Sequence, residues 1–217
     1  RRIMPPLAGV FHLAMVLDDA TLRNLNRERF QRVLRPKVHG AWNLHRLTCG
    51  RPLDLFVLFG SASSAIGNYG QANYAAGNSA LEALACHRRA AGLPATTIAW
   101  GALGDVGYVA QRPELSDSLS KLGMVPLDVG EVWQALDAAV CSRRAVSVVI
   151  RADWPRLTGK LRGAQRCEGL LARLATGLQD AGFRRVVGGT LPRSLGHRRR
   201  KAASFPLWRA GEFAGPD

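Results

Sequence analysis

The chain has 217 residues, of which 47% are hydrophobic and 21% are charged, and these proportions exclude an intrinsically disordered or a fibrous protein. Lysine and arginine outnumber acidic residues by 30 to 16, a formal charge of +14 that is typical of chains with a nucleic acid or another anionic partner. The excess is uneven, because residues 1–150 carry a net charge of +5 and residues 151–217 one of +9.

Short apolar runs alternate with helical patterns along the chain. Runs that lack alternation are typical of strands buried on both faces of a parallel sheet. In chain order the predicted elements are a strand at Val10 to Ala14, a helix at 22–47, a strand at Leu53 to Phe59, a helix at Tyr74 to Ala91, a strand at Ala95 to Trp100, a helix at Gly130 to Cys141 and a strand at Val146 to Ile150. Within the first helix, Pro36 and Gly40 predict a kink or a division.

This order predicts an α/β fold, a partial Rossmann-like doubly wound parallel sheet with right-handed crossovers. A complete sheet built from two nucleotide-binding halves has about six strands, so we expect the N-terminal nucleotide-binding strands to be missing. Beyond about Lys160 the pattern decays into sequence rich in Gly, Arg and Pro. There we expect one short helix at Cys167 to Leu178 and a flexible basic tail over 182–217.

The cysteines predict neither a zinc site nor a redox motif, because they are dispersed, form no CxxC pair and do not cluster with the histidines. Such thiols favour a reducing compartment. The cysteines are Cys49, Cys86, Cys141 and Cys167.

The N-terminal apolar stretch does not resemble a signal peptide, because it is interrupted by Pro5-Pro6 and closed after Leu17 by Asp18-Asp19. The longest uncharged run, 55–81, contains Ser, Asn, Gln and Gly and predicts no membrane span. We therefore expect a soluble, cytoplasmic protein.

Polar side chains gather where the second strand ends. Ser61 follows that strand at its carboxyl end, where open α/β sheets place their ligand sites. Tyr74 begins the next helix, and Asn78 lies four residues further on, so both side chains lie on one helix face. Lys37 on the preceding helix supplies a cation to the same crevice if the crossover is right-handed. A hydroxyl, a phenol, an amide and an ammonium group are thus expected around one crevice.

With these residues in place, the sequence resembles the catalytic half of a ketoreductase domain from a modular polyketide synthase, within the short-chain dehydrogenase/reductase superfamily. The spacing of Ser61, Tyr74 and Asn78 matches that family, as do the runs 36–45 (PKVHGAWNLH), 67–78 (GNYGQANYAAGN) and 100–107 (WGALGDVG). The likeness extends from about Pro5 to Leu157, so residues 1–158 are expected to be the catalytic part and 159–217 a basic linker or tail. Several separated motifs at matching spacings make the resemblance specific.

The resemblance implies NADPH-dependent reduction of a β-ketoacyl thioester that an acyl carrier protein holds on its phosphopantetheine arm. Tyr74 would be the general acid and Ser61 a hydrogen-bond donor to the substrate oxygen. Lys37 would favour the phenolate and lower the tyrosine pKa from about 10, while Asn78 would hold Lys37 or a relay water. Contacts with the cofactor are implied for Tyr74, Trp100 and Gly101.

Leu17-Asp18-Asp19 resembles the fingerprint of B-type ketoreductases, which give the D-configured alcohol. Ile66 occupies the place of the tryptophan that marks the A-type, which also favours the B-type. Asp19 would then orient the substrate rather than transfer a proton. An alternative is that Asp18 and Asp19 are only a charge pair near a helix N-terminus.

Other polar or aromatic residues have plainer interpretations. His12, His39, His45 and His87 lack carboxylate or cysteine partners at ligand spacing, so surface or packing roles are favoured over a metal site. Trp42 and Trp100 are expected in the core or in a pocket wall. The run 197–201 (HRRRK) admits nucleic-acid binding, but it lacks aromatic residues, and a solvated tail is favoured. Ser194 follows an arginine instead of the aspartate of a phosphopantetheine site, and we assign it none.

The glycines form no dinucleotide fingerprint, because no two are separated by a single residue, and Gly159-Lys160 is followed by Leu161 rather than Ser or Thr. Two hypotheses follow. The chain is part of a working ketoreductase completed by an upstream polypeptide, or it is a catalytically silent remnant or interaction module with a free strand edge. Under either hypothesis we expect little activity from the isolated chain.

Overall fold

The structure, a computed structural model, describes residues 5–105 and 107–157. Its centre is a parallel sheet in the order β1-β2-β3-β5. The predicted α/β class and all of the predicted strands are confirmed, with ends that differ by one or two residues. The central strand β3 is buried over its whole length, which explains why its sequence does not alternate. The strands are β1 (Gly9–His12), β2 (Leu55–Ser61), β3 (Thr96–Trp100) and β5 (Val146–Val149).

The connection from β1 to β2 is helical but divided, as Pro36 and Gly40 predict. It consists of the 3₁₀ turn η1 (Leu22–Asn24), α1 (Arg27–Leu34), the π-helical turn η2 (Arg35–His39) and α2 (Gly40–Thr48). Pro36 cannot donate a backbone hydrogen bond. The N–H of Gly40 reaches back five residues to the carbonyl of Arg35, which widens the turn. The buried residue of this turn is Lys37.

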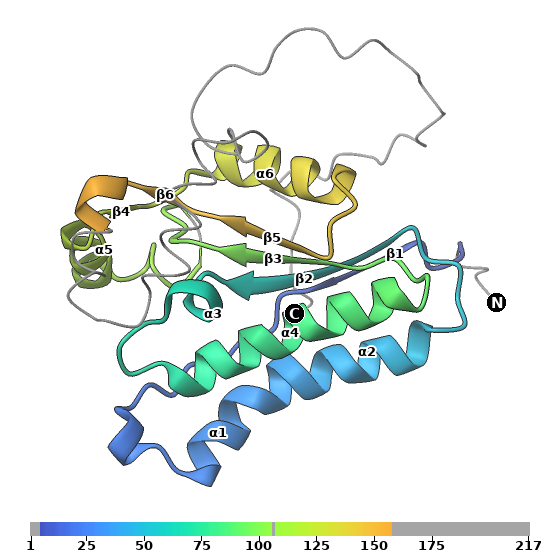
Figure 1. Ribbon diagram of the computed structural model, residues 1–217, viewed down its shortest axis with the longest axis horizontal. Helices are drawn as coiled ribbons and strands as arrows, with labels where there is room; N and C mark the ends of the chain where they lie inside the picture. Colours follow the sequence, from blue (N-terminus) through green and yellow to red (C-terminus); the bar gives the residue numbers. More distant parts are fainter. Residues whose placement is uncertain (1–4, 106, 158–217) are drawn as a thin grey trace, which may run out of the picture.

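The connection from β2 to β3 is made by the short helix α3 (Ser63–Ile66) and by α4 (Ala72–Ala90), which confirms the helix predicted at 74–91. Gly92 follows α4 with a φ of 74°, a left-handed conformation that glycine adopts without strain. α2 and α4 lie side by side on one face of the sheet (Figure 1). Their core against that face includes Phe56, Leu58, Leu81 and Leu84.

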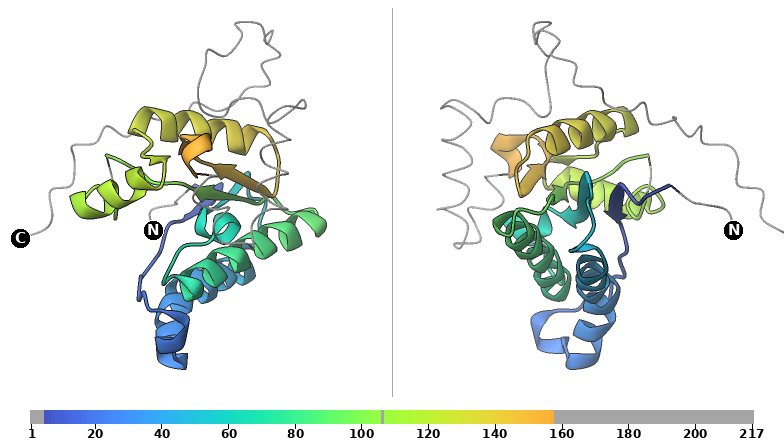
Figure 2. Two further views of the ribbon diagram at one scale, coloured as in Figure 1. Left: turned by 60° about the vertical axis from the view of Figure 1, so that its left-hand side comes forward. Right: turned by 90° about the vertical axis from the view of Figure 1, so that its right-hand side faces the viewer.

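The opposite face of the sheet is covered by α6 (Val129–Cys141), which Asp128 and Glu131 begin with a capping box. Ala135 and Ala139 of α6 pack with Val57 and Ile98, and Figure 2 shows the helices in two layers about the sheet. The strand order advances in one direction, yet the third connection crosses the face opposite to the first two. It therefore has the opposite hand, and the prediction that all crossovers are right-handed is wrong.

Besides the short helix α3, three described elements were not predicted, namely α5 (Pro113–Lys121) and the antiparallel pair β4 (Met124–Val125) and β6 (Arg151–Ala152). They lie beyond the carboxyl ends of the parallel strands (Figure 1). Two-residue strands carry no periodicity that a sequence pattern could reveal. The helix predicted at Cys167 to Leu178, the boundary at 158/159 and the tail over 182–217 lie outside the described residues. None of the described helices is long and apolar enough to span a bilayer.

Candidate active site

Ser61 is the last residue of β2 and lies at the carboxyl edge of the sheet, where the sequence places it. Its register partner is Trp100, the last residue of β3. The Ser61 hydroxyl oxygen accepts a hydrogen bond from the N–H of Ser63 at 3.2 Å, and the Ser61 carbonyl accepts one from the hydroxyl of Ser64 at 2.8 Å. The first turn of α3 thereby holds Ser61 in place while its hydroxyl proton stays available for donation.

Tyr74 and Asn78 both lie in the first two turns of α4, and both are buried. The Asn78 amide nitrogen donates to the carbonyl of Tyr74 at 2.9 Å and to the hydroxyl of Ser63 at 3.4 Å. The Asn78 Oδ1 atom is buried and has no hydrogen-bond partner among the described residues. The amide is therefore fixed in orientation and presents an open acceptor next to the tyrosine.

Lys37 reaches the same place from the π-helical turn, as the sequence predicts. Its side chain is buried, with a relative exposure of 2% for the residue. The Nζ atom donates to the carbonyl of Phe59 at 3.2 Å and lies 5.1 Å from the centroid of the Tyr74 ring. Because Asn78 Oδ1 accepts no hydrogen bond, Asn78 does not hold Lys37 in this structure, and the carbonyl of Phe59 takes that role.

The turn that carries Lys37 is itself held by a residue that sequence reasoning did not assign to the site. His12 of β1 is buried, and its Nε2 atom donates to the carbonyl of Lys37 at 2.8 Å. Gly77 lies on the other side, where an added Cβ would come within 3.4 Å of Lys37 Cδ and 3.3 Å of Leu34 Cδ2. The only available signal for His12 was its position in an apolar strand, and for Gly77 its place between Tyr74 and Asn78.

Burial dominates the electrostatics of the site. Desolvation lowers the pKa of Lys37 to about 8. Desolvation also raises the pKa of Tyr74, and the charge of Asp19 raises it further, while Asn78 and Ser61 act in the opposite direction. The pKa of Tyr74 is thus raised overall, whereas a net lowering by Lys37 was expected. The ammonium group lies over the ring face rather than at the oxygen, and burial of the phenol outweighs it.

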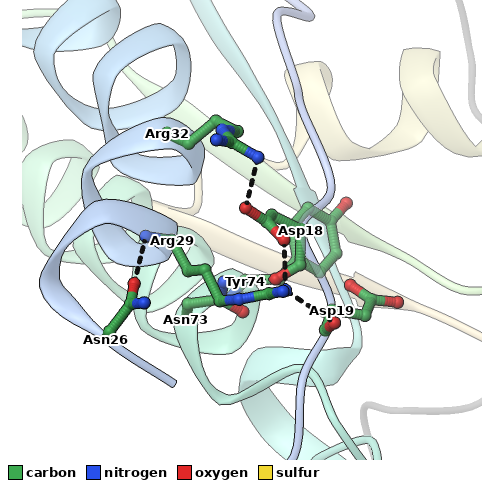
Figure 3. A network of polar contacts seen from close by, with 7 residues as sticks. All are labelled: Asp18, Asp19, Asn26, Arg29, Arg32, Asn73 and Tyr74. Carbon is green, nitrogen blue, oxygen red and sulfur yellow. Dashed lines mark hydrogen bonds and ion pairs between the residues drawn. The ribbon is translucent and has the colours of Figure 1, made fainter. Parts of the chain in front are cut away.

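The segment 15–20 lies beside Tyr74 and the start of α4. The Tyr74 hydroxyl makes a weak contact of 3.9 Å with the sulfur of Met15. Asp18 forms ion pairs with Arg29 and Arg32 of α1, as Figure 3 shows. Neither Asp18 nor Asp19 lies in the first turn of η1 or α1, but the Asp19 carboxylate accepts from the side chain of Gln71, the N-cap residue of α4. A charge pair near a helix N-terminus therefore stays an alternative interpretation of these residues.

Asn73 joins this segment to the tyrosine, and sequence reasoning gave it no role. The side chain is fully buried; its amide nitrogen donates to the carbonyl of Asp18 at 2.8 Å, and its Oδ1 accepts from the backbone N–H of Tyr74 at 2.8 Å (Figure 3). The available signal was its place directly before Tyr74 in the run 67–78. One amide thus binds the Asp18 backbone to the first turn of α4.

The residues predicted for cofactor contact lie at the same sheet edge. Trp100 is buried in the core beside α6, with its ring centroid 5.6 Å from that of Phe59, and within the part of the chain that the structure describes its indole Nε1 has no hydrogen-bond partner. The N–H of Gly101 donates to the carbonyl of Val149 at 2.7 Å. A Cβ at Gly101 would lie 3.2 Å from that carbonyl oxygen, so the two backbones approach more closely there than most side chains allow. Their contact with a cofactor stays a prediction.

Two further predictions concern residues away from this cluster. Trp42 is 47% exposed and lines a groove of about 530 Å³ between α2 and α4, together with His39 and His87; the prediction of a pocket wall is therefore met. Ile66 is buried against Met124 and Leu157. Among the described residues no group of His, Cys, Asp and Glu could hold a metal ion.

Comparisons with known proteins agree on one family. Residues 1–105 match the family model named "KR domain". The chain is 40% identical over 217 residues to the spectinabilin polyketide synthase system protein NorB of Streptomyces orinoci, a match that covers 88% of the chain and 10% of that protein. It is 43% identical over 155 residues to the phthioceranic/hydroxyphthioceranic acid synthase of Mycobacterium tuberculosis, covering 69% of the chain and 7% of the synthase.

Solved structures give the same result. An A-type ketoreductase from a modular polyketide synthase superposes with a TM-score of 0.70 at 38% identity, over 72% of this chain and 33% of that one. The first ketoreductase of the tylosin polyketide synthase superposes with a TM-score of 0.66 at 44% identity, over 71% and 34%. The chain therefore spans about a third of these ketoreductase structures and a tenth or less of the curated synthases.

Proposed function

The chain belongs to the ketoreductase domain family of modular polyketide synthases, within the short-chain dehydrogenase/reductase superfamily, and we propose that it contributes the catalytic residues for reduction of a β-ketoacyl thioester to the β-hydroxyacyl thioester. The observation that carries this proposal is the convergence of Ser61, Tyr74 and Lys37 at one end of the sheet. These residues come from β2, α4 and η2, separate elements that only the fold brings together.

The proposed chemistry needs a proton for the oxygen of the ketone when hydride reaches its carbon. Ser61 donates a hydrogen bond to that oxygen and orients the ketone. Tyr74 then transfers its phenolic proton to the oxygen as negative charge develops there. The raised pKa of Tyr74 keeps the phenol protonated at neutral pH, which is the form that a general acid requires.

Lys37 and Asn78 act on the tyrosine that is left behind. The positive charge of Lys37 stabilises the phenolate. The attraction between the two charges is stronger in this buried environment than it would be in water. The open Oδ1 of Asn78 is a suitable acceptor for a water that returns a proton to the site. A protonated lysine is the major form at neutral pH even with a pKa of about 8.

The proposed reductant is NADPH, which supplies the hydride when bound. Tyr74, Trp100 and Gly101 would hold its reacting end, and the fit is supported by the unpartnered indole N–H of Trp100 and by the close backbone approach at Gly101. The chain itself has no glycine fingerprint for the pyrophosphate. We therefore propose that an upstream polypeptide supplies that part of the site.

We propose further that the substrate is carried by an acyl carrier protein and that the product is the D-configured alcohol of a B-type enzyme. The presence of Leu17-Asp18-Asp19 and of Ile66 supports the B-type. Superposition on an A-type structure does not weigh against it, because that likeness concerns the shared fold. The free thiols of Cys49, Cys86 and Cys141 support a cytoplasmic location, where thiols stay reduced.

The test is NADPH oxidation with a β-ketoacyl thioester, measured for the chain alone and for the chain joined to its upstream polypeptide. We expect little turnover from the chain alone and clear turnover from the joined protein. Tyr74→Phe should abolish that turnover, whereas Tyr69→Phe, which alters a tyrosine that is 88% exposed, should not. No reduction in the joined protein would refute the function and favour a silent remnant; reduction that survives Tyr74→Phe would refute the site.

A further inference from the structure

Asp18 and Asp19 are neighbours in the sequence, yet their carboxylates have different partners. Both oxygens of Asp18 are used, since Oδ1 accepts from Arg29 at 2.5 Å and Oδ2 from Arg32 at 2.9 Å. The Asp18 side chain is only 11% exposed. The Asp19 carboxylate instead accepts a hydrogen bond from Gln71 at 2.9 Å. Figure 3 shows the Asp18 carboxylate directed toward α1 and the Asp19 side chain directed away from it.

We propose that Asp18, held by Arg29 and Arg32, is a positioning residue that fixes where the Asp19 carboxylate stands relative to Tyr74. The two arginines lie three residues apart and so present their side chains on one face of α1. A single exposed ion pair is worth little, but two arginines on one largely buried carboxylate form a network that restrains it. Arg29 also donates to the backbone carbonyl of Asp19 at 3.3 Å.

The other side of the same segment is bound to the start of α4. Asn73 donates to the carbonyl of Asp18, as described above, and the N–H of Ala20 donates to the carbonyl of Gly70 at 2.8 Å. The backbone on both sides of Asp19 is therefore bound, by α1 through Asp18 and by the loop before Tyr74 through Ala20. Among the described residues, the side-chain partner of Asp19 is Gln71, a half-buried residue whose own Oε1 atom accepts from the exposed Asn68 at 2.9 Å. The position of Asp19 accordingly depends on this contact and on the backbone anchors on both sides of it.

Under the proposed function, the restraint on Asp18 also governs how the substrate is oriented. If Asp19 orients the acyl substrate beside Tyr74, loosening Asp18 lets Asp19 move while Ser61, Tyr74 and Lys37 stay in place. Reduction then continues with a less selective choice of ketone face. The role of Asp18 would thus be one of position, distinct from the direct role proposed for Asp19.

The test uses the full chain and needs no turnover, so its failure is separate from failure of the proposed function. Nuclear magnetic resonance of ¹³C-labelled tyrosine, with Tyr74→Phe to assign the signal, measures the pKa of Tyr74. The charge of Asp19 raises that pKa, so Asp19→Asn should lower it. Arg29→Gln should lower it as well, because Asp19 moves away. Removing a positive charge would by itself raise a phenol pKa, so a decrease identifies repositioning.

A second measurement guards against a merely structural effect. Amide hydrogen exchange at Ala20 should be faster in Arg29→Gln and in Arg32→Gln, and Arg29→Lys should restore part of the protection. Arg27→Gln removes the same charge from an exposed position on the same helix and should change neither quantity. An unchanged Tyr74 pKa and unchanged Ala20 exchange in folded Arg29→Gln and Arg32→Gln would overturn the proposal.

Discussion

The Nε2 atom of His12 donates a hydrogen bond to the backbone carbonyl of Lys37 at 2.8 Å, and this bond joins the edge strand of the sheet to the turn that carries the buried ammonium group. Both residues are buried. Gly40 permits the contact, because a Cβ there would lie 3.0 Å from the His12 ring. The placement of Lys37 over Tyr74 therefore depends on a residue outside the catalytic set.

We predict that His12→Leu destabilises the chain by about 1–3 kcal/mol, the usual cost of a buried carbonyl left without its donor. Urea unfolding followed by circular dichroism measures this change. His39→Ala is the matched control, since His39 is exposed on the same turn and should alter stability far less. Equal effects of the two substitutions would show that the hydrogen bond to Lys37 is not important.

Lys37→Met should stabilise the chain at neutral pH while abolishing any reduction. Burial lowers the pKa of Lys37 from 10.5 to about 8, which corresponds to a cost on the order of 3 kcal/mol for keeping it charged; loss of the hydrogen bond to Phe59 offsets part of the gain. The folded chain binds fewer protons than the unfolded chain between pH 8 and 10.5. The wild type should therefore gain stability as pH rises through that window.

The measurement is the free energy of unfolding of the wild type and of Lys37→Met at several pH values between 7 and 10.5. The difference between them should be largest near pH 7 and should shrink as the lysine loses its proton. A difference that stays constant across this range would contradict the lowered pKa. Because other groups titrate in both proteins, only the difference is diagnostic.

The stability of the folded chain should have a second pH dependence, which arises in the C-terminal halves of α2 and α4. His45 is buried, and its Nδ1 atom lies 3.0 Å from the Nη1 atom of Arg88, which donates to it. Burial lowers the pKa of His45 from 6.5, and the charges of Arg88 and His87 lower it further. Neutral His45 can accept this hydrogen bond and protonated His45 cannot. The stabilisation that this hydrogen bond gives to the folded chain is thus fully present above pH 6.5 and is lost as pH falls below that value.

His45→Asn tests this directly, because its amide oxygen can accept from Arg88 but does not titrate. We expect the melting temperature of the wild type to fall more than that of His45→Asn between pH 7.5 and pH 5. Trp42 and His87 pack around the imidazole, so His87→Asn serves as a control for a nearby histidine without this bond. Parallel curves for wild type and His45→Asn would refute the assignment.

We expect the isolated chain to self-associate through its edge strand β1. β1 pairs with β2 alone among the described strands, and Phe11 and Leu13 beside its free edge are 49% and 56% exposed. Exposed apolar side chains on an unpaired edge favour pairing with another chain. The double substitution Phe11→Lys and Leu13→Lys should shift the chain toward the monomer in light scattering. Leu22→Lys, at a residue that is 77% exposed on η1, should not.

The sequence by itself determined the elements of the sheet and most of the chemistry of the site. Unalternating apolar runs identify strands buried on both faces, and the spacing of Tyr74 and Asn78 places them on one helix face. Such signals are local, because they depend on residues a few positions apart. Short elements such as β4 and β6 have too few residues to carry a period, and for this reason they escaped prediction.

Only the tertiary structure decided which groups meet across the fold and what their surroundings do to them. Three choices show this: Lys37 binds the carbonyl of Phe59 rather than Asn78, burial raises the pKa of Tyr74 although a cation lies near its ring, and Asp18 pairs with arginines on α1. Each depends on distance and solvent access between residues far apart in the chain. The desolvation of a titratable group depends on all the residues that the fold packs around it. The direction of its pKa shift is therefore not encoded in a pattern of residues that are neighbours in the sequence.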